Sequence, residues 1–210
     1  MLMAHLFHHT FKAMGSPCQM QFFAESESQA KALYQAILDR VGTLESRYSR
    51  YRENSLITEI NRRAGSRTRT EIDPETFAIL NYADQCYQES DGMFDVTSGV
   101  LRNLLHFDSN TVPSQSEIKQ LLPLIGWNIV EWAEEWIYLP KIGMELDFGG
   151  IVKEYAADTA AGLCRNWGVS SAIIELGGDI KVVGPLPDGS GWPVAVRDPL
   201  HPEKKLPNFI

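Results

Sequence analysis

The segment Asp147-Phe148-Gly149-Gly150-Ile151-Val152-Lys153 combines a carboxylate, two adjacent glycines and a lysine at the expected start of a helix. Glycines let a ligand approach the backbone closely, and the free N–H groups at a helix start favour anions. Asp147 can accept hydrogen bonds from a base or ribose, or help to hold a metal, and Lys153 can add a point charge for a phosphate. A structural alternative stays open, in which Asp147 lies near an N-cap and the glycines serve only a tight turn.

Three further segments carry weaker signals. In Ser90-Asp91-Gly92-Met93-Phe94-Asp95-Val96-Thr97, a thioether and an aromatic ring follow a glycine. Both groups can stack on a planar heterocycle, although residues after a helix end also often face the core. Gly177-Gly178-Asp179 repeats the glycine pair at an expected strand end, where a plain β-turn is the favoured interpretation. Met14, beside the turn at Gly15, has the position of an ordinary packing residue.

Composition restricts how a ligand could be held. The chain has 210 residues, with 19 Lys+Arg against 27 Asp+Glu and a formal net charge of -8. Its 44% apolar and 22% charged residues are typical of a globular protein with a proper core. The acidic balance argues against broad binding to nucleic acid or anionic membranes. A phosphate-bearing ligand must therefore be held by backbone N–H groups, by isolated Lys or Arg, or by a metal cation.

The cysteines and the N-terminus predict the compartment. Cysteine occurs only at Cys18, Cys86 and Cys164. Three scattered thiols suit neither a disulfide framework nor a zinc site, and predict buried thiols in a reducing compartment. We interpret His5, His8 and His9 as exposed residues on a fraying terminus, with a metal-binding tract as the alternative. Without a cationic leader or an apolar run of about 18 residues, the chain is expected in the cytoplasm with no membrane span.

Common catalytic motifs do not occur in the sequence. It contains no GxxxxGK[ST] loop, no GxGxxG after an expected strand, no Gly-x-Ser-x-Gly elbow and no HExxH pair. The usual routes to nucleotide hydrolysis, dinucleotide binding, acyl transfer and zinc proteolysis therefore lack support.

Apolar periodicity predicts the helices. After Ser26, the residues with helical spacing are Ala30, Leu33, Tyr34, Ile37, Val41, Leu44 and Tyr48. Asp73-Pro74 is typical of a helix start and Ser90-Asp91-Gly92 of a helix end, so a second helix is expected between them. A short helix is expected over 116–122 and a long one after Gly150. The stretch 47–70 is interpreted as polar and Arg-rich.

Alternation and turn residues predict the strands. Cys18, Met20 and Phe22 alternate with polar residues after a turn at Gly15-Ser16-Pro17. Further strands are expected at 129–132 with 136–139, at 144–148, at 172–176, and at 181–183 with 192–196. Because hairpins outnumber parallel crossovers, we predict an α+β fold, a mainly antiparallel sheet covered by helices, in one domain over 1–210.

Six segments occur together in one order. They are Ala13-Met14-Gly15-Ser16, Arg50 to Ile57 with Ile60-Asn61, Ser90 to Thr97, Asp147 to Ala156, Leu176-Gly177-Gly178-Asp179-Ile180 and Trp192 to Pro199. In that order the chain resembles the ApbE family, the FAD:protein FMN transferases, from about Phe11 to Pro199. The resemblance implies an ApbE-like, T-fold-related architecture.

The resemblance also implies an activity and a site. Such an enzyme depends on Mg²⁺, cleaves the pyrophosphate of FAD and attaches FMN through a phosphoester to a Ser or Thr of an acceptor protein, releasing AMP. Typical acceptors are subunits of membrane redox complexes. Carried over by position, the FAD-site residues are Met14, Tyr51, Gly92, Met93, Phe94, Asp147 and Lys153. Gly150 corresponds to a backbone contact to Mg²⁺, and no catalytic residue is assigned.

The family pattern continues beyond the segment at Asp198-Pro199. It includes a Thr-Ser-Gly strand, a His-x-x-Asp-Pro-x-Thr-Gly stretch and an Asp-containing helix with further Mg²⁺ ligands, which this sequence of 210 residues lacks. His201 precedes a proline but lacks the rest of that motif. The expectation is therefore a C-terminally shortened ApbE-like chain, with a non-catalytic FAD-binding protein or fragment as the alternative.

Overall fold

The computed structural model describes residues 4–104 and 113–195. Helices and antiparallel strands are mixed in it, which confirms the α+β prediction. The described residues form two compact units, divided between residues 39 and 40 and between residues 156 and 157: unit 1 holds the described residues before and after these two points, and unit 2 holds those between them. The boundaries fall within α1 (Glu27–Tyr48) and α5 (Val152–Asn166), the two long helices expected after Ser26 and Gly150. The single-domain interpretation stays a prediction.

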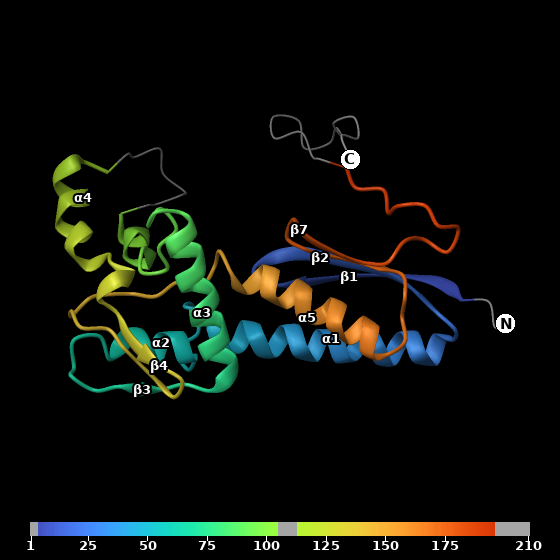
Figure 1. Cartoon of the computed structure of the whole chain (residues 1–210), viewed down its shortest axis with the longest axis horizontal. Coiled ribbons are helices and arrows are strands. Elements are labelled where there is room, and N and C mark those ends of the chain that lie inside the picture. Colours follow the sequence, from blue (N-terminus) through green and yellow to red (C-terminus); the bar gives the residue numbers. More distant parts are fainter. Residues whose placement is uncertain (1–3, 105–112, 196–210) are drawn as a thin grey trace. The chain divides into compact units, whose positions relative to one another are not determined.

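Unit 1 is built on a four-stranded antiparallel sheet. Its strands, in spatial order, are β1 (His5–Ala13), β2 (Ser16–Ala24), β6 (Ala172–Leu176) and β7 (Asp179–Val183). The unit 1 portions of α1 and α5 lie along one face of this sheet (Figure 1). Alternate residues of β2 are buried on that face, including Met20 and Phe22, together with Leu33 and Ile37 of α1. The alternation expected around Phe22 is therefore confirmed.

The N-terminal stretch is a strand, so its interpretation as a fraying terminus is wrong. β1 pairs with β2 along its whole length, from His5 opposite Ala24 to Ala13 opposite Ser16. His5 and His8 are exposed, whereas the half-buried His9 ring stacks on Tyr34 with centroids 4.1 Å apart. The alternation was hidden because His9 takes a position that an apolar residue usually holds. Among the described residues, no three His, Cys, Asp or Glu side chains gather as metal ligands do.

The His9 ring makes the stability of unit 1 depend on pH. Burial, with a smaller effect of the neighbouring His8, lowers the pKa of His9 below its usual 6.5. The unfolded chain therefore binds a proton at a higher pH than the folded chain does, and the free energy of unfolding falls as the pH drops below about 6.5. Urea unfolding at pH 7.5 and pH 5 will show this loss. His9→Phe is expected to show a smaller loss, and equal losses in both proteins would contradict the explanation.

The second hairpin of unit 1 differs from the expected one. β7 pairs with β6 across Gly177-Gly178, whose φ angles of +63° and +106° suit a tight hairpin turn. The predicted pairing of 181–183 with 192–196 is wrong: residues 192–195 form no strand, and Val196 lies outside the described residues. The first turn is also displaced, since Met14 and Gly15 form it and Ser16 already begins β2.

Unit 2 contains the central part of the chain. Its helices are α2 (Leu56–Arg62), α3 (Pro74–Glu89), α4 (Gln115–Leu121) and the short 3-10 helices η1 (Gly99–Asn103), η2 (Leu122–Leu124) and η3 (Trp127–Ile129). Its antiparallel sheet has the order β3 (Thr70–Glu71), β5 (Trp136–Tyr138), β4 (Glu131–Ala133). The expected α3 is confirmed, and its N-cap Asp73 accepts a hydrogen bond from the Thr76 N–H at 2.9 Å.

Two interpretations of unit 2 were incomplete. The stretch 47–70 holds α2, whose N-cap is the buried Ser55 and whose Ile57 and Ile60 are buried. The strand expected over 144–148 is not formed, and only Glu145 makes an isolated bridge, with Ser98. In place of a neighbouring strand, the Asn61 side chain accepts from the Leu146 N–H at 2.7 Å and donates to the Leu146 carbonyl at 3.0 Å. Because Leu146 pairs with a side chain and not with another strand, no ladder of main-chain hydrogen bonds forms. The segment is therefore not part of a sheet.

The expectation of buried thiols holds for two of the three cysteines. Cys18 and Cys164 are buried, Cys86 is partly exposed, and all three are free thiols. Burial raises the pKa of the Cys164 thiol to about 11, so this side chain is a packing group and not a nucleophile. Across residues 4–104 and 113–195, no helix has the length and apolar character needed to cross a membrane.

Candidate functional site

Buried side chains hold the bend between Asp147 and Val152 in place, and its two glycines are exposed to solvent. Phe148 and Ile151 are buried, whereas Gly149 and Gly150 are exposed. The Phe148 carbonyl accepts from the N–H groups of Ile151 and Val152, both at 2.9 Å, and its ring packs against Tyr48 with centroids 5.9 Å apart. The buried ring therefore anchors the start of α5, while the glycine backbone faces solvent, as a ligand-binding bend requires.

Both oxygens of the Asp147 carboxylate have protein partners. Oδ1 accepts from the Gly149 N–H at 2.9 Å, and Oδ2 pairs with Arg50 Nη1 at 2.7 Å. The Asp147 N–H donates to the Val96 carbonyl at 2.8 Å, which fixes the main chain as well. The Asp147 side chain is still 31% exposed. The Gly149 N–H is thus hydrogen-bonded within the protein, as in the alternative in which this glycine serves a tight turn. One edge of the Asp147 carboxylate remains accessible to a ligand.

Arg50 links Asp147 to Tyr51, although reasoning from sequence did not assign Arg50 to the site. Its Nη2 donates to Tyr51 Oη at 3.1 Å, and its guanidinium lies 5.2 Å from the centre of the Tyr51 ring. Nη1 also donates to the Gly99 carbonyl at 3.5 Å. Tyr51 itself is 78% exposed. The signal available in the sequence was the adjacency of Arg50 and Tyr51 in a segment that carries the family resemblance.

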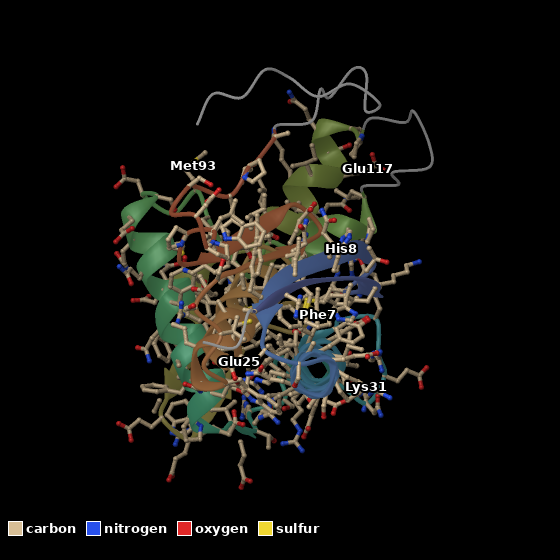
Figure 2. The ribbon with its side chains drawn as sticks, turned by 90° about the vertical axis from the view of Figure 1, so that its right-hand side faces the viewer. Phe7, His8, Glu25, Lys31, Met93 and Glu117 are labelled. Atoms are coloured by element: carbon tan, nitrogen blue, oxygen red, sulfur yellow. The ribbon has the colours of Figure 1, made fainter. Side chains whose placement is uncertain are left out.

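The segment after α3 contributes a ring to the bend. A Cβ on Gly150 would lie 3.1 and 3.3 Å from two atoms of the Phe94 ring, so the ring packs directly over this glycine. Gly92, with φ +80°, lies in the turn that follows α3, and its N–H donates to the Tyr87 carbonyl at 2.8 Å. Met93 is 88% exposed, and Figure 2 shows it projecting from the ribbon. A core-facing position is therefore wrong for Met93, whereas Phe94 is half-buried against Gly150.

The remaining predicted residues lie on either side of the unit boundary. Lys153 is half-buried in the first turn of α5, directly after the bend. Met14 belongs to unit 1, where it is half-buried in the β1–β2 turn with φ +50°. The Gly177-Gly178 turn of unit 1 lines a hollow of about 470 Å³ together with Ser16, Pro17, Glu175, Ile180, Val194 and Ala195. Within unit 2, the structure thus joins Tyr51 to Asp147 through Arg50, and Phe94 to Gly150.

Magnesium prefers oxygen ligands and usually keeps several waters, with one or two carboxylates and substrate phosphates completing its shell. At the bend, the oxygen donors are the Asp147 carboxylate and the carbonyl of the exposed Gly150. Asp147 is already paired with Arg50, and the described residues contain no cluster of three acidic, His or Cys ligands. These oxygen ligands fit a Mg²⁺ ion whose remaining ligands are phosphate oxygens and water.

Comparison with known proteins agrees with the family that the order of motifs indicates. The family model described as the ApbE family matches residues 14–209. The chain belongs to the ApbE family. The crystal structure of the Pseudomonas stutzeri flavinyl transferase ApbE, in its apo form, is 26% identical and has a TM-score of 0.83. That match covers 94% of this chain and 65% of the other. The Vibrio cholerae flavin transferase ApbE, 22% identical with a TM-score of 0.85, shows the same fold.

Curated relatives carry one name. The chain is 34% identical over 164 residues to the "FAD:protein FMN transferase" of Chlamydia trachomatis, a match that covers 75% of this chain and 51% of the relative. It is 28% identical over 197 residues to the protein of that name from Klebsiella pneumoniae, covering 92% and 59%. The ApbE-family chain therefore spans about half the length of the curated relatives it matches.

Proposed function

We propose that this ApbE-family protein transfers the FMN half of FAD to a Ser or Thr hydroxyl of an acceptor protein. The hydroxyl oxygen forms a bond to the FMN phosphorus, the pyrophosphate P–O bond breaks, and AMP leaves with the bonding electrons while the hydroxyl proton passes to a base. The observation that carries the proposal is the bend at Asp147 to Gly150, whose glycines are exposed, whose carboxylate is held by Arg50 and beside which the Phe94 ring packs. The names of the relatives supply the reaction class.

The residues of unit 2 suit distinct parts of FAD. The exposed Tyr51 ring and Met93 thioether offer flat and polarisable surfaces to a heterocycle. Asp147, fixed by Arg50 and Gly149, is placed to accept hydrogen bonds from ligand donors. Lys153, at the start of α5, adds positive charge where the helix dipole also favours phosphate. We include Met14 and Gly92 as proposed FAD contacts on the resemblance.

We propose Mg²⁺ as the required metal, with the Gly150 carbonyl as its contact from the bend. A bound Mg²⁺ supplies positive charge to the pyrophosphate oxygens, which phosphoryl transfer requires. Such a cation suits a chain with a formal net charge of -8, which otherwise repels a diphosphate. For the acceptor we propose a subunit of a membrane redox complex.

Covalent labelling of an acceptor tests the proposal. The protein is incubated with FAD, Mg²⁺ and an acceptor domain that carries a Ser or Thr flavinylation site, and flavin fluorescence is then read in a denaturing gel. We expect a fluorescent acceptor band and one AMP released per label. Two controls should give no labelled acceptor. In one, the target Ser or Thr of the acceptor is replaced by alanine, and in the other EDTA removes Mg²⁺.

The same mixtures distinguish the alternative. Tight FAD binding in titration calorimetry, without AMP release, would identify a non-catalytic FAD-binding protein. Failure to label an acceptor that the Klebsiella pneumoniae relative does label would contradict transfer by this chain. An unchanged melting temperature in saturating FAD and Mg²⁺ would contradict binding itself, since a ligand that binds only the folded state raises stability.

A further inference from the structure

We propose that Arg50 is a positioning residue of the FAD site, which holds the Asp147 carboxylate and the Tyr51 hydroxyl in one fixed arrangement. This inference rests on the proposed function, because it explains how the candidate FAD contacts are placed before FAD arrives. Neither the motif pattern nor the names of the relatives assign a role to this residue.

The contacts of Arg50 reach two distant segments and the adjacent residue Tyr51. Nη1 lies 2.7 Å from Asp147 Oδ2 and 3.5 Å from the Gly99 carbonyl oxygen, and Nη2 lies 3.1 Å from Tyr51 Oη. The Arg50 side chain is only 14% exposed, in contrast to the surface pair Arg63–Glu59, where the exposures are 42% and 47%. A partly buried guanidinium with several hydrogen bonds has a defined orientation. An exposed ion pair is less fixed and contributes little to stability.

The effect of Arg50 passes through Asp147 to the glycine bend. With Oδ2 held by Arg50, Oδ1 faces the Gly149 N–H at 2.9 Å and closes the turn that leads into α5. The same ion pair compensates the negative charge of Asp147, which stands beside the exposed glycines where a diphosphate is proposed to bind. Arg50 therefore does two things: it orients the carboxylate, and it reduces the repulsion between this carboxylate and the ligand.

Lysine cannot replace this arginine. A guanidinium is planar and presents donors along two directions, so one group serves both Asp147 and Tyr51. An ammonium keeps the charge but is a point donor on a flexible stem, and it loses the fixed fork. The variant Arg50→Lys thus separates orientation from charge, and Arg50→Gln removes the charge while it keeps a planar donor group.

The test uses the full chain and two measurements. The first is the exchange rate of the Gly149 amide, followed by NMR without FAD. The second is FAD affinity from titration calorimetry, with kcat and KM of transfer where the protein is active. Arg63→Lys is the matched control, because Arg63, the C-cap residue of α2, pairs with Glu59 at 2.9 Å at the surface and with none of the candidate contacts. Thermal melting confirms that each variant is folded.

We expect Arg50→Lys to speed Gly149 exchange and to raise the Kd for FAD about tenfold, the effect of one charge-assisted hydrogen bond. Arg63→Lys should match the parent protein in both measurements. If Arg50→Lys leaves amide exchange and FAD affinity unchanged, the positioning role is wrong. If the parent protein does not bind FAD, the proposed function fails, whereas faster Gly149 exchange in Arg50→Lys would still support the role of Arg50 in ordering the bend.

Discussion

Replacement of Phe148 by alanine is expected to lower the free energy of unfolding by about 3 to 5 kcal/mol. The ring is 1% exposed and packs against Tyr48, so its loss leaves a cavity as well as removing buried apolar surface. Because the Phe148 carbonyl also accepts from Ile151 and Val152, a shift of this residue would loosen the start of α5. Urea unfolding followed by tryptophan fluorescence measures the loss.

Two companion variants make the Phe148 result specific. Phe148→Leu fills most of the space and is expected to lose about 1 to 2 kcal/mol. Met93→Ala removes a side chain that is 88% exposed and should change stability by no more than about 0.5 kcal/mol. Equal stability of Phe148→Ala and Met93→Ala would show that the bend has no anchor at Phe148.

Removal of the Asp147 side chain is expected to weaken FAD binding about a hundredfold. Asp147→Ala eliminates the carboxylate that we propose accepts from FAD, and one hydrogen bond to a charged group contributes about 1.5 to 3 kcal/mol. It also removes the acceptor for the Gly149 N–H and the partner of Arg50. The variant also leaves the Arg50 guanidinium without its carboxylate in a site where that side chain is only 14% exposed. Calorimetric titration of FAD in the presence of Mg²⁺ measures the affinity.

The matched control for Asp147→Ala is a neighbouring carboxylate. Glu145 pairs with Arg102 at 2.9 Å, two positions earlier in the same extended segment, and Glu145→Gln should leave FAD affinity within about twofold of the parent. Asp147→Asn keeps an acceptor for the Gly149 N–H and is expected to fall between parent and alanine variant. Tighter FAD binding by Asp147→Ala would mean that Asp147 serves only the turn, with the released Gly149 amide and Arg50 free to hold the phosphates.

The sequence predicted those elements whose conformation is determined by residues close together in the chain. The apolar stripe of α1 and the Asp73-Pro74 start of α3 are determined within a few residues, and both helices are confirmed. β1 was missed because His9 hides the alternation, and its partner surface on Tyr34 comes from another element. The pairing of β7 with β6 was missed because a two-glycine turn competes with a longer loop further along the chain.

The site was predicted in its parts but not in its connections. Asp147, Gly150 and Phe94 come from motifs that are visible in the chain, and the cytoplasmic location and the individual FAD contacts stay predictions. The ion pair of Arg50 with Asp147 joins segments far apart in sequence, so no local pattern reports it. The strand expected over 144–148 failed for the same reason, since the groups that bond to this segment lie elsewhere in the chain.

The side chain of Asn61 restricts which mutations this region can accept. Its amide is a donor and an acceptor at a fixed separation, so it substitutes for one peptide unit across a span of 85 residues. Aspartate would offer two acceptors where one donor is needed, and glutamine would place the amide one methylene too far. A substitution of Asn61 is therefore expected to disturb the extended segment at Leu146, although the two residues are 85 positions apart in the sequence.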